Sequence, residues 1–158
     1  MVKYLIYSFF IVFGLSCAAN NKNFKSTATE YAADGIVFIS FNFKKDNNTV
    51  KVSYVETIQS AGTLKTRNEY EKTEESKYLI QLQDEKGRPL ADCYIADPLV
   101  EHKDVFSEDG KIEKGVVKFD EKIISLRIQK LSKEIAKASV FEVVASGQPK
   151  YIINLICK

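Results

Sequence analysis

The sequence predicts an all-β fold, an antiparallel β-sandwich of about seven to nine short strands that follows an N-terminal signal segment. Three observations support this fold class. Apolar and polar residues alternate with a period of two in many stretches after residue 36. Turn-forming residues separate these stretches. Only one short segment has a helical pattern. The same pattern also fits a small lipocalin-like β-barrel, which is the alternative fold.

The first predicted hairpin covers residues 37–55. Apolar side chains occupy alternate positions from Val37 to Phe43 and again from Val50 to Tyr54. Between these stretches, the sequence Asp46-Asn47-Asn48 favours a turn. A looser strand is expected further on, at 63–70.

The second hairpin has the clearest pattern. Apolar residues alternate over 78–82, and the chain returns over 90–95. The turn between them contains Gly87, whose backbone adopts conformations that other residues avoid. Pro98 follows the returning strand and ends it, because proline has no N–H to donate to a sheet.

The remaining strands follow the same reasoning. Asp109-Gly110 is a turn, and the stretches 116–119 and 123–131 flank Asp120-Glu121, which predicts a third hairpin. The segment 131–138 fits either one helical turn capped by Ser132 or a loop. Strands at 140–144 and 151–156 complete the predicted domain.

Size and charge exclude several classes of protein. The chain has 158 residues, of which 45% are apolar and 28% charged, as in one ordinary globular domain. The formal net charge is only +2, and Lys3 lies in the segment expected to be removed. The mature domain is therefore nearly neutral, which argues against a nucleic-acid partner, because nucleic acid binding requires a basic face.

The first residues have the features of a signal peptide. A basic start at Lys3 precedes an apolar stretch at 4–15, and small residues follow. The apolar stretch is shorter than the roughly 20 residues that span a membrane. We therefore predict a signal peptide at 1–16, with an uncleaved N-terminal anchor as the alternative.

The end of this segment, Gly14-Leu15-Ser16-Cys17, resembles the lipobox of bacterial lipoproteins and departs from it only where Gly14 replaces the usual Leu. The resemblance implies that Cys17 is lipidated and becomes the N-terminus, so that membrane lipid is one partner. Two or more acyl chains would anchor it stably. Ordinary cleavage after Ala18 is the competing interpretation.

These features divide the chain into three parts. Residues 17–33 form the lipidated cysteine and a flexible tether, because they are mostly polar or small. Residues 34–158 form the β-sandwich domain. By resemblance to the sorting rules of Gram-negative bacteria, Ala18 indicates an outer-membrane lipoprotein of the cell envelope. A soluble secreted or periplasmic protein is the alternative.

Cys93 and Cys157 remain as candidates for a disulfide bond, since an exported protein meets oxidising conditions. A bridge would contribute about 4 kcal/mol on the chain-entropy model. Two separate buried thiols are the equal alternative, because sequence gives no Cα separation.

The sequence offers little support for catalysis or metal binding. His102 is the single histidine, and the carboxylates around it, Glu101, Asp104, Glu108 and Asp109, match neither zinc nor calcium spacing. Cys93 lies within a predicted strand, a poor place for a nucleophile. No nucleophile elbow, phosphate loop or dinucleotide fingerprint occurs. We expect no enzyme, no metal and no cofactor.

The stretch Tyr78-Leu79-Ile80-Gln81-Leu82-Gln83-Asp84, which turns through Gly87 to Leu90, resembles a hairpin of immunoglobulin-like domains in Bacteroidota envelope proteins. One such domain precedes the catalytic part of M64-type peptidases. This resemblance implies an immunoglobulin-like sandwich. It carries no activity, because the chain has no catalytic motif of that family.

The function that these observations favour is a non-catalytic binding or assembly module for an envelope protein or glycan. Tyrosines favour interfaces and are the candidates for a binding face: Tyr31, Tyr54, Tyr70, Tyr78, Tyr94 and Tyr151. A lipocalin-like carrier of a small apolar ligand is the alternative, and it requires strands closed around a cavity.

Overall fold

Nine strands and no helix form the part of the chain that this computed structural model describes, residues 31–65, 70–106, 110–144 and 149–157. The all-β prediction is therefore confirmed. The strands are β1 (Tyr31–Asp46), β2 (Thr49–Ser60), β3 (Tyr78–Gln83), β4 (Pro89–Ile95), β5 (Val100–Phe106), β6 (Ile112–Lys118), β7 (Glu121–Leu131), β8 (Lys137–Val143) and β9 (Pro149–Ile156).

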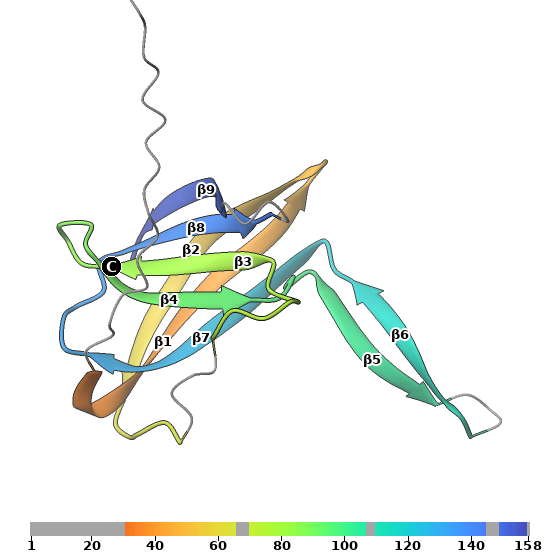
Figure 1. Ribbon diagram of the computed structural model, residues 1–158, viewed down its shortest axis with the longest axis horizontal. Helices are drawn as coiled ribbons and strands as arrows, with labels where there is room; N and C mark the ends of the chain where they lie inside the picture. Colours follow the sequence, from red (N-terminus) through yellow and green to blue (C-terminus); the bar gives the residue numbers. More distant parts are fainter. Residues whose placement is uncertain (1–30, 66–69, 107–109, 145–148, 158) are drawn as a thin grey trace, which may run out of the picture.

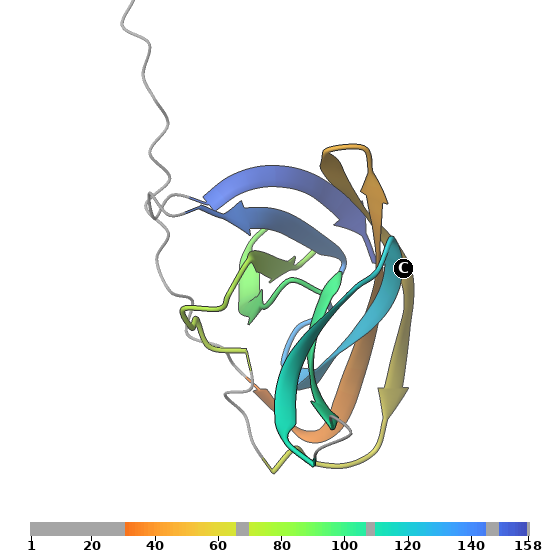
Figure 2. The same ribbon diagram turned by 90° about the vertical axis from the view of Figure 1, so that its right-hand side faces the viewer.

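The strands form two facing sheets and a separate ribbon (Figures 1 and 2). One sheet has the order β2-β1-β7 and the other β4-β3-β8-β9, while β5 and β6 pair only with each other among the described strands. All of the pairings among these nine strands are antiparallel. The predicted sandwich is confirmed, and the described strands do not close into the lipocalin-like barrel that was its alternative.

The order of strands can be compared with an antibody domain. The sequence β9-β8-β3-β4 corresponds to the order G-F-C-C′ of a variable domain. In the other sheet the first strand, β1, occupies the centre, whereas in antibodies the first strand lies at the edge of the A-B-E-D sheet. Many immunoglobulin-like domains share the sandwich architecture without the same topology.

The first hairpin is confirmed and is longer than predicted. β1 begins at Tyr31, within the segment predicted as a tether, and β2 continues to Ser60. Asn47 takes a positive φ of 53° in the turn, a conformation that asparagine tolerates well. The Thr49 hydroxyl closes the turn by donating to the Asp46 carbonyl oxygen over 3.0 Å.

The second hairpin is also confirmed, and Asp84 organises its turn. The Asp84 carboxylate accepts hydrogen bonds from the backbone N–H groups of Lys86 and Arg88 at 3.0 and 2.9 Å, and from the Arg88 guanidinium at 2.6 Å. The Arg88 backbone N–H is the main cause that lowers the pKa of Asp84. Gly87 supplies the positive φ of 74° that the turn needs.

The third predicted hairpin is wrong. β6 pairs with β5, and β7 pairs with β1, so the two stretches that flank Asp120-Glu121 do not meet. The chain instead passes from the ribbon into the sandwich at this point, where the Asp120 carbonyl oxygen accepts from the Lys45 N–H at 2.7 Å. β7 joins β1 because its apolar face, which includes Leu126 and Ile128, completes the core.

Other segments also differ from the prediction. No strand occurs in the described parts of 63–70, and β5 was not predicted. Between β7 and β8 the chain is a loop, so the helical turn is absent there and the loop alternative holds. The Asp109 half of the predicted turn lies outside the described residues.

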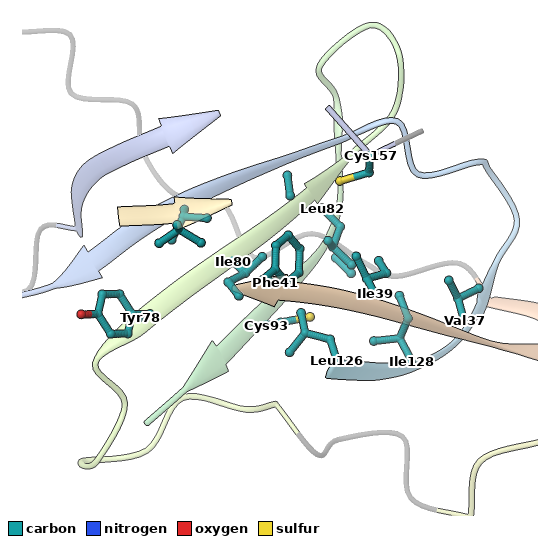
Figure 3. Packing of buried hydrophobic residues seen from close by; sticks show 14 of the residues in the cluster. Val37, Ile39, Phe41, Tyr78, Ile80, Leu82, Cys93, Leu126, Ile128 and Cys157 are labelled. Carbon is teal, nitrogen blue, oxygen red and sulfur yellow. The ribbon is translucent and has the colours of Figure 1, made fainter. Parts of the chain in front are cut away.

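The core lies between the two large sheets (Figure 3). β1 contributes alternate residues, as its pattern predicts, and these pack against the inner residues of the facing sheet. The rings of Phe43 and Tyr78 lie 5.3 Å apart. Each large apolar side chain buried in this way contributes about 1.5–3 kcal/mol. The fully buried large residues include Ile39, Phe41, Phe43, Tyr78, Ile80, Leu82, Leu126 and Val140.

Candidate functional site

The most distinctive surface of the molecule is the β5–β6 ribbon, which projects from one end of the sandwich (Figure 1). Its register runs from Val100 opposite Lys118 to Phe106 opposite Ile112. No third strand joins either of its edges within the described chain. Both edges therefore present backbone N–H and C=O groups that a further strand could pair with.

Apolar side chains are exposed on both faces of the ribbon. Phe106 and Ile112 are 74% and 62% exposed and lie opposite each other on one face, which also carries Val116. Val105 and Val117 are exposed on the other face. Exposed apolar residues gathered in this way mark interaction surfaces, whereas scattered ones need no explanation.

The base of the ribbon is fixed to the sandwich. The Phe119 N–H donates to the Leu99 carbonyl oxygen at 2.9 Å, and Leu99 belongs to the core. Lys122 of β7 donates to the Glu101 carboxylate at 3.1 Å, and this bond is the main cause that lowers the pKa of Glu101. The Lys122 ammonium also lies 4.7 Å from the centre of the Phe119 ring. The ribbon is thus joined to the sandwich at its base, and along the rest of its length β5 and β6 pair only with each other among the described strands.

A second surface, the outer face of the four-stranded sheet, carries a polar network. The Gln81 amide donates to the Asp92 carboxylate at 2.9 Å, and the Gln83 amide donates to the Ser139 hydroxyl at 2.9 Å. The Ser139 hydroxyl in turn donates to Asn154 at 2.6 Å. These groups hydrogen-bond one another across four strands, which leaves fewer of their donors and acceptors for a polar ligand.

The tyrosines do not form a common binding face in the described residues. Tyr78 belongs to the core, and burial is the main cause that raises its pKa to about 12. The Tyr70 hydroxyl accepts the Arg127 N–H at 2.8 Å, and the Tyr54 hydroxyl donates to Thr57 at 3.1 Å. Tyr94 is half-buried, and Tyr151 is exposed on β9, where its ring contacts Phe141. The side chain of Tyr31 lies outside the described part of the molecule.

Cys93 and Cys157 are both free and buried. Both belong to the cluster of buried core residues, and Figure 3 shows their two sulfur atoms apart within it. Burial raises the pKa of Cys93 to about 12 and that of Cys157 to about 11. Thiols with such pKa values are almost entirely protonated near neutral pH and are poor nucleophiles.

The residues considered for chemistry are not brought together. Cys93 lies in β4 within the core, whereas His102 is exposed on the ribbon opposite Val116. The described residues contain no group of three or more His, Cys, Asp or Glu side chains that could hold a metal ion. Glu108 and Asp109, two of the carboxylates near His102 in the sequence, lie outside the described residues.

Cys17 and the predicted signal peptide also lie outside the described residues, so the lipidation site stays a prediction. Within the described chain there is no helix with the length and hydropathy to cross a bilayer.

Comparison with known proteins gives no assignment. No family model, no curated protein and no solved structure matches the chain. The sequence reasoning missed the ribbon, although the exposed pairs Val105-Phe106 and Val116-Val117 are visible in the sequence as apolar residues among charges.

Proposed function

We propose that this protein is a non-catalytic binding or assembly module of the bacterial cell envelope and that the β5–β6 ribbon binds its protein partner. The observation that carries the proposal is a two-stranded ribbon with free edges and exposed apolar residues. A two-stranded hairpin alone is at best marginally stable in water. A partner that pairs with an edge or covers the apolar face would supply the missing contacts.

Two observations favour a protein over the other partners considered. The ribbon offers backbone edges and apolar side chains, which suit another polypeptide. The polar groups on the outer face of the four-stranded sheet hydrogen-bond one another, so fewer of them are available to a glycan there. The lipocalin-like carrier requires a closed barrel, whereas the space between these sheets is filled by the core.

The proposed location is the outer membrane, through a lipidated Cys17. The described chain begins, at the start of β1, at the end of the sandwich remote from the ribbon (Figure 1). A membrane anchor before β1 would therefore leave the ribbon directed toward other envelope components. Labelling cells with radioactive palmitate should mark the wild-type protein and leave a Cys17→Ser variant unmarked. Label that persists in the variant would contradict the anchor.

The partner is tested by comparing three forms of the protein purified from chemically crosslinked cells. The first is the wild type, and the second is a Phe106→Ser, Ile112→Ser double variant. The third, a matched control, is a Val55→Ser, Ile58→Ser variant, which changes an exposed apolar pair on β2. The proposal expects one envelope protein with the wild type and the control, and its loss with the ribbon variant. Equal recovery with all three would contradict it.

A further inference from the structure

A groove with a volume of about 520 Å³ opens beside the end of β7. This end of β7 lies at the side of the sandwich away from the ribbon (Figure 1). Pockets that bind small molecules usually have volumes of about 300–1,000 Å³. Residues of β1, β2, β7, the loop between β7 and β8, and the C-terminal segment line the groove. Figure 3 shows Val37 and Cys157, two of these residues, toward the end of the core remote from Tyr78.

The floor of this groove is apolar and held in place. Val37, Leu131 and Cys157 are buried in the core and also line the groove, together with the half-buried Ile135. Two backbone hydrogen bonds fix the loop that forms one wall. The Ala136 N–H donates to the Gln83 carbonyl oxygen at 2.9 Å, and the Ala136 carbonyl oxygen accepts from the Cys157 N–H at 2.8 Å. The apolar floor is therefore formed before any ligand arrives.

The rim of the groove carries unpaired positive charge. Lys130 and Lys133 both line it, and neither makes an ion pair within the described chain. Glu134 contributes one negative charge to the rim, so the net charge of these three side chains is +1. By contrast, Lys122 at the base of the ribbon pairs with Glu101 at 3.1 Å.

Neutral polar groups complete the rim. Thr57 and Gln59 of β2 also line the groove. The Thr57 hydroxyl accepts a hydrogen bond from Tyr54 at 3.1 Å, which leaves its own proton available to a ligand. The groove thus combines an apolar floor with hydrogen-bond donors and a net positive rim, and this is the complement of an amphiphile with a negative head.

We propose that this groove binds a free single-chain amphiphile with an anionic head group, of the class of a fatty acid. The chain lies on the floor formed by Val37, Leu131 and Cys157, and the head lies between Lys130 and Lys133. A volume of about 520 Å³ is in the lower half of the usual range, which suits one chain. This site is separate from the ribbon. The proposal of a ligand here therefore does not depend on whether the ribbon binds a protein partner.

The test uses the full chain with Cys17→Ser, so that Cys157 in the groove and Cys93 in the core are the two remaining thiols. The probes are dodecanoate and dodecyltrimethylammonium, which share a chain length and differ in the sign of the head. We expect dodecanoate, below its micelle concentration, to slow alkylation of Cys157 at about pH 9 and to leave Cys93 unaffected. The cationic probe should bind at least about tenfold more weakly.

Charge variants make the test specific. Lys130→Gln with Lys133→Gln should weaken dodecanoate binding about tenfold, and Glu134→Gln should strengthen it a few-fold, because both changes act on charge at the rim. These side chains are on the surface, so the variants should fold. No protection of Cys157 by dodecanoate, equal binding of the two probes, or an unchanged affinity in the double variant would overturn the proposal. Association with anionic vesicles without binding of free dodecanoate would also overturn it.

Discussion

The side-chain amide of Gln129, only 1% exposed, donates a hydrogen bond of 2.9 Å to the backbone carbonyl oxygen of Gly35. Its oxygen accepts the N–H of Leu64 at 2.9 Å. One buried side chain of β7 thus joins the start of β1 to the segment after β2. Gly35 itself has a φ of 120°, and a Cβ there would lie 3.1 Å from the Lys130 side chain, so glycine is required at this contact.

We expect Gln129→Leu to lower the free energy of unfolding by about 2–4 kcal/mol, because it leaves two backbone groups without partners, each costing about 1–3 kcal/mol. Gln59→Leu makes the same chemical change at an exposed position of β2 and is the control. Urea unfolding of both variants gives the comparison. Equal stability of the two would show that the Gln129 hydrogen bonds contribute little.

Substitution of one phenylalanine in the core and one in the ribbon should affect the free energy of unfolding very differently. Phe41 is fully buried, and Phe41→Ala should lower the free energy of unfolding by about 3–5 kcal/mol. Phe106 is exposed, and Phe106→Ala should change this free energy by less than about 0.5 kcal/mol. Urea unfolding measures both values. A large loss with Phe106→Ala would mean that the ribbon packs on the sandwich, which would contradict its description as a free-standing element.

The buried thiol of Cys93 makes stability fall at high pH. Burial, with a contribution from Asp92, raises its pKa to about 12 in the folded protein, while the thiol of an unfolded chain has a pKa of about 8.5. Between these values the unfolded chain loses a proton that the folded protein keeps. The free energy of unfolding therefore falls as the pH rises from about 9 to about 12. Cys93→Ala should flatten this slope, as measured by urea unfolding at several pH values.

Cys157→Ala is the matched control for that slope. The pKa of Cys157 is raised to about 11, so its removal should flatten the slope less. Thiol titration of the denatured, unreduced Cys17→Ser chain should find both cysteines free. A bridged pair would give no reactive thiols and no slope from either residue.

The ribbon should also open more readily than the sandwich. β5 and β6 pair only with each other, whereas β3 lies between β4 and β8 with both of its edges paired. Amide hydrogens of β5 and β6 should therefore exchange with solvent at least about a hundredfold faster than those of β3. Hydrogen exchange followed by mass spectrometry gives these rates, and equal protection of the ribbon and β3 would contradict the prediction.

Most of the sandwich could be predicted because burial on one face imposes a period of two. The alternation from Val37 to Phe43 places every second residue in the core, and the hairpin around Gly87 is marked by its turn. The ribbon could not be predicted in this way. Both of its faces are exposed, so nothing requires Val105 and Phe106 to alternate with polar residues.

The false hairpin, the groove and the separation of the two cysteines could not be predicted because they depend on contacts between distant parts of the chain. The false hairpin around Asp120-Glu121 arose because local turn signals cannot tell which strand a neighbour pairs with, and β7 pairs with the distant β1. The groove joins Val37 and Cys157, which lie at opposite ends of the described chain, so no local motif marks it. The separation of Cys93 and Cys157 is likewise set only by the packing of the sheets.

The central claim, that the ribbon binds an envelope protein, is tested most directly by photo-crosslinking in living cells. A photoreactive phenylalanine analogue is placed at Phe106, and in a second strain at Ile58, which is an exposed apolar position on β2. The claim predicts that irradiation links position 106 to one envelope protein and that position 58 yields no such adduct. No adduct from position 106, or the same adduct from both positions, would contradict it.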